Sequence, residues 1–171
     1  MIKPNLKIAQ VGNPILRQQA QCVTDITDDK LQEFIDTLLT IAMDAKGVGI
    51  AAPQVSQSYR LFMVCSHPNP RYPDAPLMEP TVMINPRLVS HSKEMVKGWE
   101  GCLSVPRIRG LVPRYQTITV EYLDRYGQLH QQELTDFIGR IFQHELDHLN
   151  GILFIDRIDN QGDLIYEKTG Q

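Results

Sequence analysis

Apolar residues recur at steps of three and four positions in two stretches of the chain. This spacing places them on one face of an α-helix. In the first stretch, residues 31–43, the apolar stripe ends before Gly47 and predicts a helix whose apolar face belongs to the core. The second stretch, residues 136–151, has Thr135 available as N-cap and Gly151 as C-cap, and predicts a helix near the C-terminal end.

Between the two predicted helices, the apolar positions indicate β-strands. Five short segments that are apolar or alternating fit this description, namely residues 59–65, 81–85, 88–96, 116–124 and 128–134. Strands that follow one another through turns, and then one helix, indicate an α+β fold. We expect a single domain over residues 1–171, with antiparallel β-sheets packed around the central C-terminal helix and the N-terminal helix added to them.

Two segments fit neither pattern. Residues 66–80 contain five prolines, too many for a helix or a strand, and are expected to form a surface loop. Residues 160–171 are polar and are expected to be loosely held. The sequence shows no repeat and no linker to a second domain.

Composition and charge exclude several classes of protein. The chain has 171 residues, of which 42% are hydrophobic and 22% charged, enough to bury a core. The net charge is −3 and the basic residues are scattered, which gives no support for a nucleic-acid site or an anionic membrane surface. No apolar run approaches the ~20 residues of a membrane span, and residues 1–8 lack the apolar core of a signal peptide. Three widely spaced cysteines indicate a reducing compartment, most simply the cytoplasm.

The predicted C-terminal helix carries the sequence His144-Glu-Leu-Asp-His148. The two histidines are one turn apart, so both imidazoles leave the helix on one side and can close on a single divalent ion. Glu145 can reach a metal-bound water without being a ligand itself. The alternative is that the two histidines simply occupy the half-polar side of an amphipathic helix.

A catalytic zinc-type site takes three protein ligands and leaves one position open, so this helix is one ligand short. The metzincin pattern would place a third histidine where Phe154 stands. Because phenylalanine cannot bind a metal, the metzincin class is excluded. A downstream glutamate is available only at Glu167, in the polar tail. Cys102 is the better candidate. It lies between Gly101, which allows close backbone approach, and Pro106, which is expected to end regular structure.

A segment rich in glycine and alanine, residues 47–54, contains the dinucleotide-binding pattern G-x-G-x-x-A. It follows a helix instead of a strand, and Pro53 forbids the helix interior that should come next, so we reject this function. A loop with little side-chain bulk explains the segment better, because a small group can press against it while Gln54 supplies an amide donor. A simple glycine-rich connection from helix to strand is the alternative.

Three stretches of the chain resemble the signature motifs of peptide deformylases. They are Gly47-Val-Gly-Ile-Ala-Ala-Pro-Gln54, Glu100-Gly-Cys-Leu-Ser104 and Gln143-His-Glu-Leu-Asp-His-Leu-Asn-Gly151, in the order found in that family. The surrounding similarity runs from Val11 to Asp156. The helix motif alone is shared by many metallohydrolases, whereas the three motifs together are highly specific.

The resemblance implies a metal centre. Cys102, His144 and His148 would hold one divalent ion per chain. Fe(II) is the usual physiological metal of the family, and Zn(II), Ni(II) or Co(II) can occupy the site. The sequence does not choose between these metals.

The resemblance also implies an activity, namely hydrolysis of a linear amide, a C–N bond other than a peptide bond. The enzyme would remove the formyl group from the N-terminal N-formyl-methionine of newly made polypeptides and release formate. Glu145 would act as general base while metal-bound water or hydroxide attacks the formyl carbon, and then as general acid toward the leaving amine. The Gln54 side-chain amide and the Leu103 N–H would stabilise the charge on the formyl oxygen. We expect a cytoplasmic monomer that acts on nascent chains near the ribosome.

The substrate is expected to lie against two short segments in the manner of an added strand, Val48-Gly49 and Arg109-Gly110. A wall without side-chain bulk at Gly49 and Ala51 would admit a formyl group and crowd out larger acyl groups. The methionine side chain would enter an apolar pocket. The residues expected to bind substrate are Val48, Gly49, Gly101, Arg109, Gly110, Phe137 and Ile141.

Two rival functions stay open. The first is a metallopeptidase that cleaves ordinary peptide bonds with Glu167 as its third ligand. The second is a non-enzymatic binding module stabilised by a closed, four-ligand metal ion.

Two further features bear on the site and its branch of the family. Glu100 and Arg114 form either an ion pair that braces the metal-ligand loop or a surface pair of no consequence. Only twenty residues follow Gly151, so we expect no long C-terminal helix here. Together with Trp99, Arg140 and the long proline-rich loop, this feature resembles the branch that includes organellar enzymes and many bacterial relatives.

Overall fold

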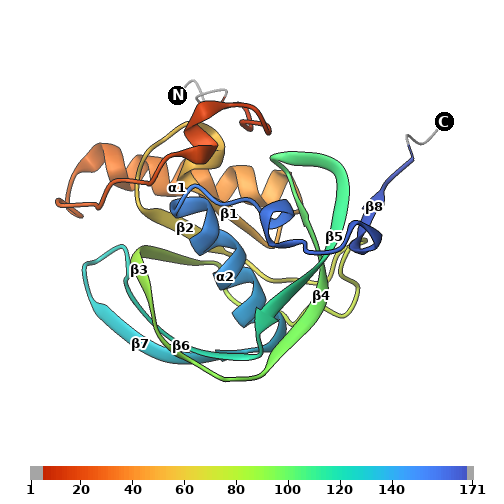
Figure 1. Cartoon of the computed structure of the whole chain (residues 1–171). Helices are drawn as coiled ribbons and strands as arrows, with labels where there is room; N and C mark the ends of the chain where they lie inside the picture. Colours follow the sequence, from red (N-terminus) through yellow and green to blue (C-terminus); the bar gives the residue numbers. More distant parts are fainter. Residues whose placement is uncertain (1–5, 169–171) are drawn as a thin grey trace.

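Two antiparallel sheets surround a central helix in the computed structural model, which describes residues 6–168 (Figure 1). This arrangement confirms the predicted α+β fold. The expectations for residues 1–5, where no signal peptide is predicted, and for residues 169–171 of the tail lie outside the described residues. The helices are α1 (Asp29–Asp44) and α2 (Asp136–Leu149). The five-stranded sheet has the order β1 (Gly49–Ala51), β2 (Leu61–Val64), β3 (Thr81–His91), β6 (Thr117–Leu123), β7 (Leu129–Thr135), and the three-stranded sheet the order β4 (Met95–Cys102), β5 (Val105–Tyr115), β8 (Leu164–Tyr166).

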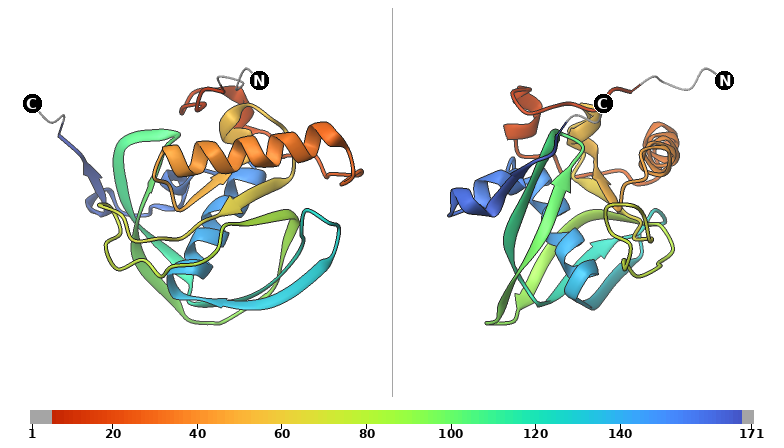
Figure 2. Two further views of the ribbon diagram at one scale, coloured as in Figure 1. Left: turned by 180° about the vertical axis from the view of Figure 1, so that it is seen from behind. Right: turned by 90° about the vertical axis from the view of Figure 1, so that its right-hand side faces the viewer.

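Strand β2 is covered on both faces, because α1 and α2 pack on opposite sides of this part of the five-stranded sheet (Figure 2). Leu61 and Met63 belong to the apolar cluster that contains the buried side of α1. Phe62 and Val64 belong to the cluster that contains α2. Burial on both faces explains why this strand is a continuous apolar run without polar alternation.

Helix α1 buries the predicted apolar stripe. Its N-terminus is capped by Asp28, whose side chain accepts a hydrogen bond of 2.9 Å from the Lys30 N–H. The buried positions are Leu31, Ile35, Leu38 and Ala42. Met43, which the pattern includes in the stripe, is 51% exposed, so the buried face ends one residue earlier than predicted.

Helix α2 is buried along most of its length, and its Phe142 ring meets Phe62 edge-on at 5.3 Å between centroids. Thr135 is the N-cap residue, but its side chain makes no capping hydrogen bond. The helix ends two residues before Gly151. That glycine has φ +74°, and a Cβ there would lie 2.6 Å from the Arg17 carbonyl oxygen, so both the turn and the close approach require glycine.

Two predicted strands have different boundaries in the structure. The pattern predicts separate strands over residues 81–85 and 88–96, whereas β3 runs without interruption to His91 and β4 starts at Met95. A register shift between β3 and β6 leaves Pro86 unpaired, which is why a proline is tolerated inside β3. The chain then passes from one sheet to the other within the segment predicted as one strand.

The sequence pattern misses strand β5. Pro106 is expected to end regular structure, yet Pro106 and Pro113 both lie inside this strand. Strand β8 pairs only with residues 108–110 of β5, so neither proline has to donate a hydrogen bond to β8. The tail, expected to be loosely held, supplies β8 at residues 164–166.

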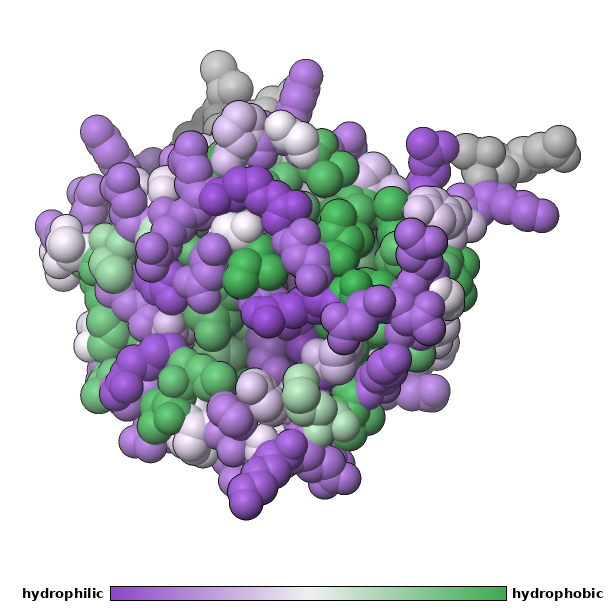
Figure 3. All heavy atoms as spheres, viewed as in Figure 1, coloured by the Kyte–Doolittle hydropathy of each residue, from purple (hydrophilic) through white to green (hydrophobic). Residues whose placement is uncertain are grey.

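Within residues 6–168, no helix has the length and apolar character needed to span a membrane. On the face seen in Figure 3, hydrophilic side chains separate smaller apolar patches.

Candidate active site

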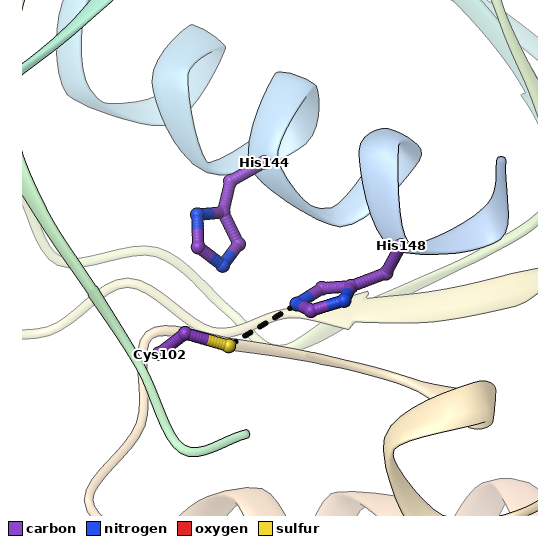
Figure 4. Close-up of side chains that lie close together, drawn as sticks. All are labelled: Cys102, His144 and His148. Atoms are coloured by element: carbon purple, nitrogen blue, oxygen red, sulfur yellow. Dashed lines mark hydrogen bonds between the residues drawn. The ribbon is translucent and has the colours of Figure 1, made fainter. Parts of the chain in front are cut away.

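Cys102, His144 and His148 meet in the interior of the protein. The ligand atoms that they offer all lie within 4.8 Å of one another, and Cys102 Sγ is 3.3 Å from His148 Nε2. Figure 4 shows both rings projecting from α2 toward Cys102. The structure therefore brings together the three residues that the resemblance implies as metal ligands, and all three are buried.

The elements that carry these residues explain the convergence. The histidines occupy successive turns of α2, while Cys102 ends β4 at a register shift just before the turn into β5. Phe154, at the position of the third histidine of metzincins, stacks on the His144 ring with 6.0 Å between centroids. Glu167 is not part of this group, and its N–H donates to the Arg107 carbonyl at the end of β8.

Glu100 is the centre of a buried ionic network behind the site. One of its oxygens accepts hydrogen bonds from His144 Nδ1 (2.7 Å) and Arg114 Nη2 (2.9 Å). The other accepts from Arg114 Nε (2.9 Å) and Arg140 Nη1 (2.8 Å). The side chains of Glu100 and Arg114 are each only 4% exposed, so the pair braces the site and is not a surface pair. A carboxylate on Nδ1 orients the ring so that Nε2 is left for a ligand.

These contacts set the charges of the network. Burial alone would raise the pKa of Glu100, but hydrogen bonds from His144 and Arg114 outweigh it and hold the pKa well below its usual range. Burial would lower the pKa of His144, yet its hydrogen bonds to Cys102 and Glu100 raise that pKa above the usual value. For His148, burial and the positive charges of His144 and Arg114 all lower the pKa, which keeps this imidazole neutral.

The network continues along α2 through Asp147. This carboxylate accepts a hydrogen bond of 2.6 Å from Arg114 Nη1 and one of 2.7 Å from Arg157 Nη2. Arg157 belongs to the short 3-10 helix η3 (Phe154–Arg157) that follows α2. Arg114 therefore ties the metal-ligand helix to β5, and Asp147 ties it to η3.

Glu145 is buried beside the ligands. Burial is the main cause that raises the pKa of this carboxyl, to about 7. Its Oε2 has no hydrogen-bond partner among the described residues. A Cβ built on Gly49 would lie 2.7 Å from Glu145 Oε1, so the space that Glu145 occupies exists only because residue 49 is glycine.

The Gln54 amide is fixed at both ends. It lies in the 3-10 helix η2 (Ala52–Val55), and its Oε1 accepts a hydrogen bond of 2.9 Å from the Ala51 N–H. This contact turns Nε2 toward Cys102 Sγ (3.4 Å) and Ser104 Oγ (3.1 Å). Leu103, the other residue implied for charge stabilisation, lines a cleft at this site together with Gln54, Cys102 and His144. Both candidates for charge stabilisation thus lie beside the three ligands.

Most of the residues expected to bind substrate lie together. The same cleft is lined by Glu145 and by four of these residues, Val48, Gly49, Gly101 and Ile141. Phe137 does not line the cleft. It packs behind the ring of Tyr72, with 5.0 Å between centroids.

Arg109-Gly110 is placed differently from the expectation. Arg109 pairs with Gly101 of β4 and with Ile165 of β8, so this part of β5 is the middle of a sheet and offers no free edge. Gly110 is buried, and a Cβ there would lie 2.8 Å from Ile158 Cδ1. At the cleft, the edge strand of this sheet is β4 and the edge strand of the other sheet is β1.

Tyr72 is a cleft residue that the sequence pattern misses. Its hydroxyl accepts a hydrogen bond of 3.2 Å from the Gly101 N–H, and its ring centre lies 5.3 Å from the Arg109 guanidinium carbon. Residues 66–80 contain no helix or strand, as predicted, but Asn69 orders them by accepting a hydrogen bond from the Tyr72 N–H at 3.1 Å. The proline-rich segment is therefore a wall of the cleft. Only the presence of an aromatic residue in it could have indicated this role.

Comparisons with known proteins agree with the motifs. The family model of polypeptide deformylase matches residues 5–163. Peptide deformylase 2 of Nostoc sp. is 63% identical over 166 residues, which cover 97% of this chain and 93% of that protein.

Solved structures show the same fold. A class I type b peptide deformylase from Acinetobacter baumannii with Met-Ala-Ser bound has a TM-score of 0.87 at 46% identity, over 90% of this chain and 98% of that one. A peptide deformylase from Synechococcus elongatus in complex with actinonin has a TM-score of 0.82 at 34% identity, over 95% and 84% of the two chains. These matches cover most of the length of this chain and of each relative. They show that the chain belongs to the polypeptide deformylase family.

Proposed function

We propose that Cys102, His144 and His148 hold one divalent metal ion, with Fe(II) as the physiological metal and Zn(II), Ni(II) or Co(II) able to replace it. The donor set fits such an ion, because a buried thiol and two imidazoles converge within 4.8 Å and Glu100 fixes one imidazole through Nδ1. Three ligands leave a coordination position open, which favours a catalytic ion over a closed structural one. When bound, a divalent ion supplies a Lewis acid that polarises a carbonyl and acidifies a water.

As a member of its family, the chain is a hydrolase that removes the formyl group from the N-terminal N-formyl-methionine of newly made polypeptides and releases formate. The observation that carries this function for the present chain is the meeting of its three sequence motifs in one cleft. Release of formate from formyl-Met-Ala-Ser by the metal-loaded protein tests it. A loaded protein that releases none would refute it.

We assign the proton transfers to Glu145. It lines the cleft, and its Oε2 is free of other partners among the described residues, so it can take the proton of the attacking water and return it to the leaving amine. Gln54 Nε2 and the Leu103 N–H are the donors assigned to the developing charge on the formyl oxygen. The Ala51 contact fixes the Gln54 amide in advance, which supports this role.

We infer that the peptide lies between the free edges of β1 and β4. Each is the outermost strand of its sheet, and both reach the cleft at Gly49 and Gly101. Backbone groups at a free edge bind an extended chain by strand addition. The methionine side chain is assigned to the apolar part of the cleft at Val48 and Ile141, with Phe137 behind its wall.

Other expectations for the protein stay predictions. They are one catalytic domain over residues 1–171, a monomer, a cytoplasmic location and action near the ribosome. Family membership supports the last two, because the substrate is a newly made polypeptide.

Gly49→Ala is expected to lower kcat/KM for formyl-Met-Ala-Ser by about 10²-fold without removing the metal. The added Cβ would lie 2.7 Å from Glu145 Oε1 and 3.0 Å from Ile141 Cγ2, so the carboxyl has to move. A displacement of about 1 Å at a catalytic group costs a factor of this order. Gly162→Ala is the control, because its Cβ would approach only the exposed Asn160 side chain. Equal activity of both variants would show that Glu145 does not depend on the space at Gly49.

Glu100→Gln is expected to weaken metal binding by about 10- to 100-fold, because the partner that orients His144 is changed. It should also lower the free energy of unfolding by about 3 kcal/mol, since Arg114 keeps Asp147 but loses the buried charge of Glu100. Metal titration and denaturant unfolding measure the two effects. In the matched control Glu121→Gln, the ion pair with the 63% exposed Arg87 is lost, at a cost below about 1 kcal/mol. Similar results for both variants would contradict the bracing role of Glu100.

A further inference from the structure

A hollow lies on the face of α2 opposite to the active-site cleft, and we call it the rear hollow. Its volume is about 400 Å³, within the range of sites that hold small molecules. Helix α2 and its C-cap line both spaces, the cleft with Ile141, His144 and Glu145 and the rear hollow with Gln143, Leu146, Asp147 and Asn150. At 3.6 residues per turn, these two sets lie on opposite sides of the helix. No residue of the described chain lines both spaces.

Apolar side chains from four elements line part of the rear hollow. They are Leu88 of β3, Met95 of β4, Pro113 of β5 and Leu146 of α2. Strand β3 belongs to the five-stranded sheet, and β4 and β5 belong to the three-stranded sheet, so the hollow lies where the two sheets meet behind α2. Tyr115 adds an aromatic ring, which is stacked on the ring of His91 with 3.7 Å between centroids. This lining fits a ligand with an apolar body better than a simple ion.

The charges that line the rear hollow are paired, with one exception. Arg114 and Arg157 both form ion pairs with Asp147. Asp156 has an ion pair of its own with an arginine near the N-terminus. Asp159 also lines the hollow and is exposed, but its carboxylate forms no hydrogen bond or ion pair with any residue from 6 to 168. Since both arginines of the lining are already paired, the charge that is left for a ligand is the negative charge of Asp159.

The rear hollow also reaches the buried network that orients His144. Arg114 and Asp147 line the hollow, although their side chains are only 4% and 8% exposed. Arg114 in turn donates to Glu100, the partner of His144 Nδ1. A ligand in the rear hollow therefore contacts the brace of the metal-ligand helix from the side opposite to the substrate.

We propose that the rear hollow binds a small organic cation, that is, an ammonium or amidinium group on an aromatic or branched aliphatic body. The cationic group pairs with Asp159 and lies beside the Tyr115 ring, since aromatic rings attract cations. The apolar body packs against Met95 and Leu146. Because the ligand lies behind α2, it binds at the same time as a peptide in the cleft. The site depends neither on the metal nor on the proposed reaction.

Benzamidine and benzamide test this proposal, because they have nearly the same size and differ in charge. The Zn(II)-loaded wild-type protein is expected to bind benzamidine with a Kd of about 1 mM, and benzamide about 3- to 5-fold more weakly. In an NMR titration, the backbone amides of Leu146, Asp147 and Asn150 should shift most. The affinity for benzamidine should stay the same at a concentration of Met-Ala-Ser that saturates the cleft.

Variants at two exposed positions separate the charge from the apolar body. Asp159→Asn should weaken the binding of benzamidine by about 3- to 5-fold and leave that of benzamide unchanged. Met95→Ala should weaken the binding of both by about 3-fold, because it removes part of the apolar lining. The matched control is Asp44→Asn, an exposed carboxylate at the end of α1, which should change neither affinity.

Equal affinities for benzamidine and benzamide, or an unchanged affinity for benzamidine in Asp159→Asn, would overturn the proposal. Displacement of benzamidine by Met-Ala-Ser would place it in the cleft and would overturn the proposal as well. The same holds if benzamidine does not bind at all. Because binding in the rear hollow does not require formate release, none of these results would refute the proposed function.

Discussion

Cys102→Ala is expected to abolish metal binding and, with it, formate release. The variant removes the thiol from a three-ligand group whose atoms lie within 4.8 Å, and two imidazoles alone leave the ion with half of a tetrahedral set. Metal content after anaerobic purification should fall from about one ion per chain to less than about a tenth of that. Elemental analysis of the purified protein measures it directly.

Two variants serve as controls for this loss. Cys22 is exposed and lies outside the ligand group, so Cys22→Ala should keep its metal and its activity. Glu167→Gln should also keep its metal, because Glu167 is not among the residues whose ligand atoms meet. A Cys102→Ala protein that retains a full ion, together with a Glu167→Gln protein that loses it, would establish the metallopeptidase alternative.

Glu145→Gln is expected to lower kcat by about 10³-fold while leaving the metal content unchanged, since the amide cannot accept the proton of the attacking water. The substitution keeps the size of a side chain that is buried next to Gly49, so the fold and the ligand geometry should persist. Turnover and metal content, measured on the same preparation, separate a catalytic role from a structural one.

The matched control for this variant is Glu133→Gln, an exposed glutamate on β7, which should behave as wild type. A metal-stabilised binding module without enzymatic activity would be indifferent to Glu145→Gln. If the Glu145→Gln variant kept full turnover, Glu145 would not be the residue that transfers the proton.

The helices and the metal ligands could be predicted because their signals are local or specific. The period of the apolar residues predicts α1 and α2, and His144 and His148 lie one helical turn apart on the second helix. Cys102 could not be placed beside them by periodicity. Its neighbours Gly101 and Pro106 and the lack of another suitable ligand make it a candidate, and the resemblance of three separate motifs, which the structure brings into one cleft, implies it as the third ligand.

The parts that could not be predicted depend on contacts between distant segments. The sequence pattern misses β5 because Pro106 and Pro113 argue against a strand. Only the pairing of β5 with β4 and with the short β8 shows that no hydrogen bond to β8 is needed from either proline. Because the sequence pattern misses β5, it does not show that Arg109-Gly110 is paired on both sides, where a peptide cannot add as a strand. Tyr72 lies in a segment without periodicity, so its place over Gly101 follows only from the folded chain.

We propose that this cleft hydrolyses a formyl amide with the aid of a metal held by Cys102, His144 and His148. The most direct measurement is formate release from formyl-Met-Ala-Ser by anaerobically purified, Fe(II)-loaded protein, with acetyl-Met-Ala-Ser as the comparison. Rapid, stoichiometric release of formate, with turnover of the acetyl peptide lower by about 10²-fold or more, is the predicted result. Either absence of formate from protein shown to hold one Fe(II) per chain, or cleavage of an internal peptide bond instead, would contradict the claim.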